Sequence, residues 1–319
     1  MRLNRFGLVF AFGLLLMLAL LKTNGDAQPN SFTEVVKGVW FREGDLSQGH
    51  CNNTVIEMKD GLVVIDANFP SGARALIADI KKVSSKPVKY VFDTHHHGDH
   101  MYGNPIWTKI GAVTFAYQGV DDELKRYEPK IWQATDRPDV KELHLSAPEP
   151  PKQTFTKSPF IIEDDTRRIE FSFFGWAHTR GDGFAYLPKE KILCTGDAAV
   201  NGPYNYIGDG NIGNWPNVIA QAQKLDILFV FPGHGPRGGV EILRGQKLFF
   251  EELRNAVKAE IKNGKKLEQI VQFEGKTPKG TTITLPDNVR KWVGGDFPGQ
   301  VATTYRELSQ NKPAGDLPH

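Results

Sequence analysis

The chain has 319 residues, of which 40% are hydrophobic and 24% are charged, and its formal net charge at pH 7 is +2. This length and apolar content support a sizeable hydrophobic core and exclude a chain that is disordered throughout. The near-neutral charge offers no general electrostatic reason to bind nucleic acid or an anionic membrane, so we expect neither as a partner.

The first 27 residues follow the three-part pattern of a secretory signal peptide. Arg2 and Arg5 precede an almost wholly apolar run from Gly7 to Leu21, and small residues permit cleavage after Ala27. The apolar run is short for a membrane span, which needs about 20 residues, so a cleaved signal is favoured over an uncleaved anchor. We therefore expect a secreted or periplasmic protein with no stable membrane anchor after cleavage.

Cysteine usage is thin for an exported protein, because only Cys51 and Cys194 are present. Cys194 lies in an apolar run that is typical of a buried strand, where a free cysteine behaves as a small hydrophobic residue. Whether the two cysteines pair stays open from the sequence, but there is no disulfide framework on which the fold depends.

Strands and helices alternate along the first part of the chain. The pattern predicts a hairpin over 54–65 with an Asp60-Gly61 turn, and Ser71 is expected to cap the helix that follows. Four prolines between 144 and 159 predict a long loop. The other predicted elements are a strand over 88–93, a helix over 103–110, a strand over 112–117 and a helix over 120–135.

The later part of the chain continues with strands and then becomes helical. Strands are predicted over 160–162, 168–174 and 224–231, with a hairpin over 183–195. Helical spacing of apolar residues then predicts a helix over 240–263 and shorter helices over 267–271 and 301–308. We expect one domain over 28–239, with residues 240–319 forming a C-terminal helical extension packed on it.

Metal-binding residue types follow four of the predicted strands. The segment Thr94-His95-His96-His97-Gly98-Asp99-His100 comes directly after strand 88–93, and His178, Asp197 and His234 each follow a later strand. Imidazole and carboxylate are the ligands that Zn²⁺ and related metals take when no thiolate is offered. Alone, Asp197 or His234 beside glycine is more often a turn residue, but their shared placement favours a metal site.

The side chains divide into two groups. We predict His95, His97 and His178 as ligands of one ion, and Asp99, His100 and His234 as ligands of a second ion. Asp197 is able to bridge the two ions, whereas His96 is expected to point away from both. Asp66 ends another strand and is a candidate to hold one imidazole by a hydrogen bond, although a simple turn cap is the alternative.

The combined motif resembles the metallo-β-lactamase superfamily. The match consists of His95-x-His97-x-Asp99-His100, then His178, Gly196-Asp197 and Gly233-His234-Gly235, in that family's order, over roughly residues 33–240. The resemblance implies an α/β fold, the four-layer αββα sandwich, with the metals at one edge. It also implies two Zn²⁺ ions, with other divalent transition metals as alternatives.

Two divalent ions about 3.5 to 4 Å apart clamp attacking and leaving oxygens, and a metal lowers the pKa of bound water to about 7. The expected chemistry is therefore attack of a metal-activated hydroxide on a carbonyl or phosphoryl centre. We expect Asp99 to act catalytically as well, by orienting that hydroxide. No protein nucleophile is required.

Three residues of a glycine-rich loop, Tyr206, Asn211 and Asn214, are predicted to contact a small-molecule substrate, with a solvated loop as the alternative. The expected function is an exported dizinc hydrolase of small cyclic or ester-like substrates, of the β-lactam or lactone class. The alternatives are a thioesterase similar to glyoxalase II, a phosphodiesterase, and a non-catalytic metal-binding or ligand-sensing protein. The sequence leaves the oligomeric state undetermined.

Overall fold

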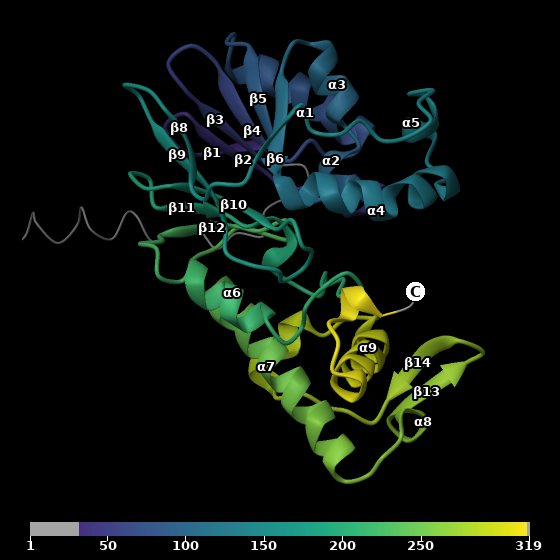
Figure 1. The fold of residues 1–319 in the computed structure, drawn as a ribbon. Helices are drawn as coiled ribbons and strands as arrows, with labels where there is room; N and C mark the ends of the chain where they lie inside the picture. Colours follow the sequence, from purple (N-terminus) through teal and green to yellow (C-terminus); the bar gives the residue numbers. More distant parts are fainter. Residues whose placement is uncertain (1–31, 318–319) are drawn as a thin grey trace, which may run out of the picture.

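The computed structural model describes residues 32–317, so the predicted signal peptide lies outside the described residues. Residues 32–231 form two sheets that face each other, with helices outside both of them (Figure 1). Helices α1 and α3 cover the first sheet, and α6 and α7 lie beyond the second. The predicted αββα sandwich is confirmed.

The first sheet has seven strands in the order β1-β2-β3-β4-β5-β6-β7. Neighbours are antiparallel from β1 to β4 and parallel from β4 to β7. Its strands are β1 (Phe32–Val36), β2 (Val39–Arg42), β3 (Asn53–Glu57), β4 (Leu62–Ile65), β5 (Val88–Asp93), β6 (Val113–Tyr117) and β7 (Gln153–Phe155).

The second sheet has five strands in the order β12-β11-β10-β9-β8, with β11 and β12 parallel and the other neighbours antiparallel. The predicted hairpin over 183–195 is confirmed as β10 and β11. The strands are β8 (Phe160–Glu163), β9 (Arg168–Phe173), β10 (Gly183–Leu187), β11 (Ile192–Cys194) and β12 (Phe229–Phe231).

Alternation along the strands divides the apolar side chains between two buried layers. In β4, Val63 and Ile65 face the second sheet, whereas Leu62 and Val64 pack under α1 and α3. Successive strand residues point to opposite faces, so a strand buried on both faces is apolar throughout, as β4 is. The polar residues that could bind a metal therefore lie at the ends of such strands rather than within them.

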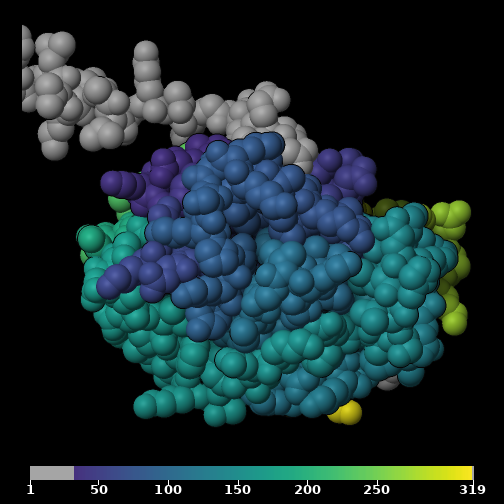
Figure 2. Space-filling model, turned by 90° about the horizontal axis from the view of Figure 1, so that it is seen from above, coloured from purple at the N-terminus to yellow at the C-terminus, as the bar shows by residue number. Residues whose placement is uncertain are grey.

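Helices of the first half lie on the outer face of the first sheet and along its β6–β7 edge. Seen from above, purple, blue and teal parts of the chain fill most of the view, and yellow-green residues of the C-terminal region show only at its margins (Figure 2). The helices are α1 (Pro70–Val83), α2 (Gly98–Met101), α3 (Asn104–Lys109), α4 (Gln118–Ala134) and α5 (Pro138–Lys141).

Residues after 240 lie against the outer face of the second sheet, beside α6 (Trp215–Ala222). The long helix α7 (Glu241–Lys262) contacts both α6 and α9 (Phe297–Gln310), and α8 (Leu267–Ile270) precedes a two-stranded hairpin. That hairpin, β13 (Val271–Glu274) and β14 (Thr277–Thr281), was not predicted within the helical extension. The domain division at residue 239 stays a prediction.

Two local predictions are wrong. Ser71 does not cap α1: the helix begins at Pro70, and the Ser71 backbone N–H and hydroxyl both donate to Asp139 instead. Proline at the first position has no N–H that needs a cap. The loop predicted over 144–159 contains the short strand β7, which pairs with β6.

Both Cys51 and Cys194 are buried and free. The Cys194 thiol donates a weak hydrogen bond to the Thr54 hydroxyl, 3.5 Å away on the facing sheet. Burial raises the pKa of each thiol to about 12, which keeps both in the neutral form.

Between residues 32 and 317, no helix combines the length and the apolar character needed to cross a bilayer.

Candidate metal centre

The predicted ligands meet at one edge of the sandwich. Four of them follow β5, namely His95, His97, Asp99 and His100. His178 lies between β9 and β10, Asp197 follows β11, and His234 follows β12. Because the two sheets face each other, the ends of β5 in one sheet and of β11 and β12 in the other lie across a narrow gap. The fold thus brings together all seven predicted ligands from distant parts of the chain.

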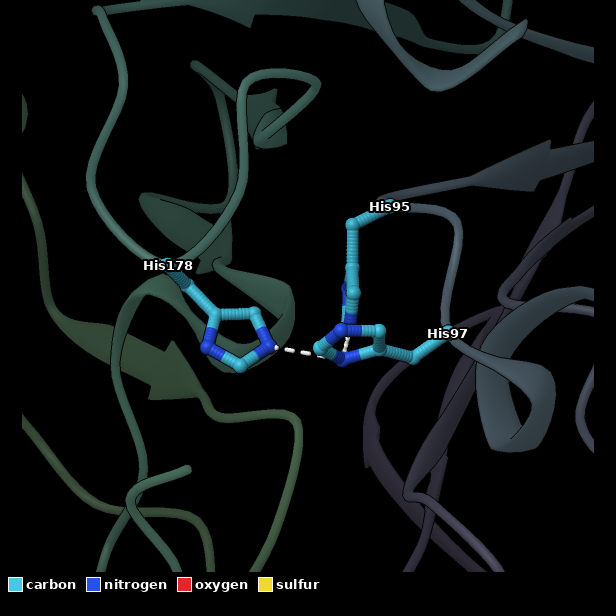
Figure 3. Close-up of side chains that lie close together, drawn as sticks. All are labelled: His95, His97 and His178. Atoms are coloured by element: carbon cyan, nitrogen blue, oxygen red, sulfur yellow. Dashed lines mark hydrogen bonds between the residues drawn. The ribbon is translucent and has the colours of Figure 1, made fainter. Parts of the chain in front are cut away.

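Two groups of side chains could each hold an ion, and the first, called the first ion site, consists of His95, His97 and His178. His97 Nδ1 lies 3.2 Å from His95 Nε2 and 3.0 Å from His178 Nε2, as the dashed lines in Figure 3 mark. The three ring nitrogens therefore converge on one point, with His178 facing the other two rings from the second sheet (Figure 3). This is the predicted grouping.

The second ion site consists of Asp99, His100 and His234. Asp99 Oδ2 lies 3.0 Å from His234 Nε2 and 3.4 Å from His100 Nε2. The His100 ring is fully buried, whereas Asp99 keeps 22% of its side chain exposed. Solvent therefore reaches this group from the Asp99 side.

Asp197 lies between the two sites. Its Oδ1 is 3.4 Å from His100 Nε2, and its Oδ2 is 3.5 Å from His234 Nε2 and 3.9 Å from His178 Nε2. Burial opposes ionisation of this carboxyl, but His234 and His100 hold its pKa well below the usual value. An ionised carboxylate in this place contacts ligands of both sites, as a bridging ligand must.

Hydrogen bonds to one nitrogen of an imidazole ring leave its other nitrogen free to face the neighbouring ligand candidates. His178 Nδ1 donates to the Tyr206 carbonyl (3.0 Å), so its Nε2 is a lone pair aimed at His97. Burial lowers the pKa of His178 to about 3, which keeps this ring neutral. Among residues 32–317, neither His100 Nε2 nor Asp197 Oδ1 has a hydrogen-bond partner, although both are buried. Buried polar atoms of this kind need a partner, and a cation satisfies all of them together.

Asp66 lies behind the second ion site. Its Oδ2 is 3.0 Å from His100 Nδ1, and its Oδ1 accepts a hydrogen bond from the Thr94 backbone N–H (2.9 Å). The residue has a positive φ of 68°, which is uncommon for a side chain other than glycine. This strained conformation aims the Asp66 carboxylate at Nδ1 of the His100 imidazole. The ring is thereby held with its Nε2 free to face a metal.

Asp209 has the corresponding place behind the first ion site, and the sequence analysis did not single it out. His97 Nε2 donates to Asp209 Oδ2 at 2.8 Å, which directs His97 Nδ1 toward His95 and His178. Burial lowers the pKa of His97, but the Asp209 carboxylate outweighs it and raises that pKa above the usual value. A more basic imidazole is a stronger metal ligand.

Asp182 and Asn52, also not singled out from the sequence, hold the ligand-bearing loops. Asp182 accepts hydrogen bonds from the backbone N–H groups of residues 177, 178 and 179, which shapes the loop of His178. Asn52 Nδ2 donates to the carbonyls of Pro232 and Gly235, on either side of His234. An aspartate four residues after a histidine in a turn-rich segment is a usable sequence signal, whereas nothing local marks Asn52.

Two glycines permit the close approach of the loops. A Cβ on Gly233 would lie 2.0 Å from Asp197 Oδ1, and one on Gly196 would lie 2.4 Å from Thr94 Oγ1. Gly196 also has a positive φ of 49°. The glycine beside each ligand is therefore required by tertiary contact as well as by the turn itself.

The three predicted substrate contacts differ in their surroundings. Tyr206 is 49% exposed, and its ring centroid lies 5.5 Å from that of His97, so it borders the first ion site. Asn211 Oδ1 accepts the Asn214 backbone N–H, and Asn214 Nδ2 donates to the Trp176 carbonyl. These amides contribute to the shape of the loop, and their contact with substrate stays a prediction.

His96 lies outside both ion sites, with its ring against Tyr127. It is fully buried rather than at the surface, and within the described chain neither ring nitrogen has a hydrogen-bond partner. Burial lowers its pKa well below the usual value, so the ring is neutral.

Comparison with known proteins identifies the family. A family model of the metallo-β-lactamase superfamily matches residues 46–234, which is more than half of the chain and includes every predicted ligand. Similar curated proteins include ribonuclease Z of Latilactobacillus sakei subsp. sakei, 30% identical over 172 residues, 47% of this chain and 53% of that protein. Another is metallo-β-lactamase type 2 of Bacteroides fragilis, which is 26% identical over 158 residues. The match covers 48% of this chain and 55% of that protein. The chain thus spans about half the length of these relatives.

Solved structures agree on the fold. A metallo-β-lactamase from Pontibacter korlensis superposes with a TM-score of 0.58 at 21% identity, covering 69% of this chain and 98% of that one. A metallo-β-lactamase from Hirschia baltica gives 0.56 at 22% identity, with 70% and 98% covered. At this identity the likeness concerns the fold alone. From the matching family model, together with this fold, the chain belongs to the metallo-β-lactamase superfamily.

Proposed function

We propose that this protein is an exported dinuclear zinc hydrolase of small cyclic or ester-like substrates, of the β-lactam or lactone class. Members of the superfamily are metal-dependent hydrolases, which supports a hydrolytic reaction. The observation that carries the proposal is the convergence of five imidazoles and two carboxylates whose free nitrogen and oxygen atoms face one another.

The residues present fit two ions. His95, His97 and His178 would hold one, Asp99, His100 and His234 the other, and Asp197 would contact both. Bound divalent ions would supply Lewis acidity and lower the pKa of water toward neutrality. The chain itself contributes imidazole rings held in the required orientations by Asp209, Asp66 and the Tyr206 carbonyl.

Asp99 is the ligand best placed for a second task. Burial opposes its ionisation, but the imidazoles of His100 and His234 hold its pKa well below the usual value, so it is a carboxylate at neutral pH. It also has the largest exposed fraction of the second ion site. We assign to it the orientation of the attacking water, which an ionised carboxylate does by accepting a hydrogen bond.

Access to the centre favours a small substrate. The partly exposed ligand side chains are His97, Asp99 and His234, and the exposed Tyr206 ring lies beside them. A near-neutral chain supports this choice, since a polyanionic substrate would need a basic face. The relatives carry both lactamase and ribonuclease names, so a phosphodiester belongs in the test.

Metal analysis and a substrate panel test the proposal. We expect about two zinc ions per chain and chelator-sensitive hydrolysis of nitrocefin or of a lactone, assayed beside a thioester and bis(p-nitrophenyl) phosphate. Turnover of only the thioester or the phosphodiester would contradict the substrate class. Two bound ions with no turnover of any panel member would favour a metal-binding or ligand-sensing protein instead.

Export rests on the pattern of residues 1–27 and is tested separately. We expect the mature N-terminus, read by intact mass, to begin at Gln28 when the full chain is produced in a host that secretes it. An intact Met1 terminus in the exported fraction would contradict cleavage after Ala27.

A further inference from the structure

The loop over residues 200–214 contacts the first ion site from behind. It supplies the Tyr206 carbonyl that accepts from His178 Nδ1 (3.0 Å) and the Asp209 carboxylate that accepts from His97 Nε2 (2.8 Å). Two of the three rings of that site therefore take their orientation from one loop. A shift of the loop would turn both rings.

The same loop is held on its other side by the C-terminal region. At its first part, Gln246 Nε2 of α7 donates to Asn205 Oδ1 (2.5 Å), and Gln300 Nε2 of α9 donates to the Asn205 carbonyl (2.7 Å). Asn205 directly precedes Tyr206. The Tyr206 carbonyl is thus one residue away from two hydrogen bonds donated by helices more than thirty residues further along the chain.

At its second part the loop is held again. Glu307 Oε2 of α9 accepts the Ile212 backbone N–H (3.0 Å), and the Gly315 N–H donates to the Gly210 carbonyl (2.9 Å). Both contacts lie one to three residues after Asp209 in the chain. The C-terminal region therefore fixes the segments next to both groups that orient the imidazoles.

Burial shows that these contacts are specific rather than incidental. Gln246 is fully buried, and Gln300 and Glu307 are 3% and 5% exposed, although each lies on a helix whose inner face is otherwise mainly apolar. Burying an amide or a carboxylate costs free energy unless its atoms find partners, and an apolar side chain would pack there without that cost. Here each Nε2 finds a partner in the side chain or the backbone of the loop, whereas Gln300 Oε1 and Asn205 Nδ2 have no hydrogen-bond partner among the described residues.

The second ion site is held differently. Its His100 donates a hydrogen bond from Nδ1 to Asp66, and the backbone around His234 is held by Asn52; both Asp66 and Asn52 lie in the first sheet and its connections. The loop over 200–214 reaches this site through Asn201, whose N–H and Nδ2 donate to the His234 and Pro236 carbonyls, and through Tyr204, whose ring centroid lies 6.2 Å from that of His234. The hydrogen bonds that orient the rings themselves nevertheless come from different parts of the chain, the 200–214 loop for His97 and His178 and Asp66 for His100.

We propose that the C-terminal region is a positioning element for the first ion site, and that Gln246 and Gln300 are positioning residues acting through Asn205. This rests on the proposed function only in requiring that the centre binds two metal ions. A region that served only to cover the second sheet would make both sites equally sensitive to changes in it.

The test is the double variant Gln246→Met with Gln300→Met, which keeps side-chain volume and removes both donors to Asn205. The matched control is Tyr305→Phe, also on α9, whose hydroxyl donates to the Lys265 carbonyl and not to the loop. Each protein is stripped of metal and titrated with Co²⁺ against a chromophoric chelator. Imidazole ¹⁵N spectra of the zinc forms then report each ring separately.

We expect the double variant to bind one ion about tenfold more weakly, the scale typical of lost partners behind metal ligands, and the other ion with little change. The ring signals of His97 and His178 should shift, and those of His100 and His234 should not. The Tyr305→Phe protein should match the wild type in both measurements.

Equal weakening of both ions, or unchanged binding of both with unchanged His97 and His178 signals, would overturn the positioning role. Thermal unfolding of the metal-free proteins separates a general loss of folding, which would lower both affinities, from loss at one site. Failure of the wild-type chain to bind two ions would instead overturn the proposed function itself.

Discussion

At the scale of single residues, the hydrogen bond behind each histidine decides which nitrogen faces a metal. Asp209 and Asp66 are the clearest cases, because each carboxylate accepts from the ring nitrogen remote from the ion site. A carboxylate in this place fixes the tautomer and increases the basicity of the ring. Asp209 lies in a glycine-rich loop, whereas Asp66 directly follows strand β4.

Asp209→Ala is expected to weaken binding of one of the two ions by about 10- to 100-fold, because His97 loses the partner that fixes its tautomer. Equilibrium titration with Zn²⁺ against a competing chelator measures this. Asp165→Ala is the control, since that carboxylate is 85% exposed and forms a surface ion pair with Lys59, far from the ligand candidates in its contacts. Equal affinities in the Asp209 variant and the control would contradict the role of Asp209.

Asp197→Ala is expected to lower the occupancy of the second ion and the hydrolytic rate together. The reason is that this carboxylate lies against ligands of both sites, so its loss removes the bridge as well as one negative charge. Metal content after dialysis and steady-state rates are measured on the same sample. A variant that still contains two ions per chain would contradict a bridging role of Asp197.

At the scale of elements, the ligand-bearing loops are shaped from outside by residues distant in sequence. The connection after β12, which carries His234, is held by three hydrogen bonds from Asn52: two from its side chain and one from its backbone N–H to the Gly233 carbonyl. The loop itself is short and rich in glycine, so it has few conformational restraints of its own.

Asn52→Ala should lower the free energy of unfolding by about 2 to 4 kcal/mol, since it leaves the buried Pro232 and Gly235 carbonyls and the Gly44 N–H unpaired. Urea unfolding of the metal-free protein measures the loss. Asn217→Ala, at an exposed position of α6, is the comparison, where a change within about 0.5 kcal/mol is expected. An equally small loss of unfolding free energy in Asn52→Ala would contradict the role of Asn52 in holding the His234 loop.

The sequence patterns predicted elements well where periodicity was strong and poorly where tertiary pairing decided. The hairpin over 54–65 and the strand over 88–93 are present as β3–β4 and β5, because apolar β-branched runs favour buried strands. The hairpin β13–β14 and strand β7 were missed. Both are short and polar or exposed, so their pairing depends on neighbours rather than on their own pattern.

At the scale of the whole molecule, the metal centre joins the two sheets and the C-terminal region, so metal binding is expected to stabilise the folded chain. Metal-free protein should unfold at a lower temperature than zinc-loaded protein. Each ion present at about 100 times its Kd adds about 2.7 kcal/mol. Scanning calorimetry with and without EDTA measures the shift, and His178→Ala should show a smaller one. Identical melting in zinc and in EDTA would contradict a resident metal.

The seven ligand candidates were recognisable from the sequence because the types of residue and their places after apolar strands carry chemical information. His95, His97, Asp99 and His100 lie within six residues of one another, so a single loop can present them together. Membership of the superfamily followed from the order of the motifs and is confirmed by the family match.

Other features depended on tertiary structure alone. Asp209 contacts His97 across 112 residues of sequence, and Asn52 contacts the His234 loop across 180, so no local pattern marks either. The glutamine contacts from α7 and α9 to Asn205 are of the same kind. Sequence by itself determined the chemistry of the centre, because donor atoms belong to residues. Only the packing of sheets and helices decided which nitrogen and oxygen atoms face each other, because hydrogen-bond partners are chosen by distance in space.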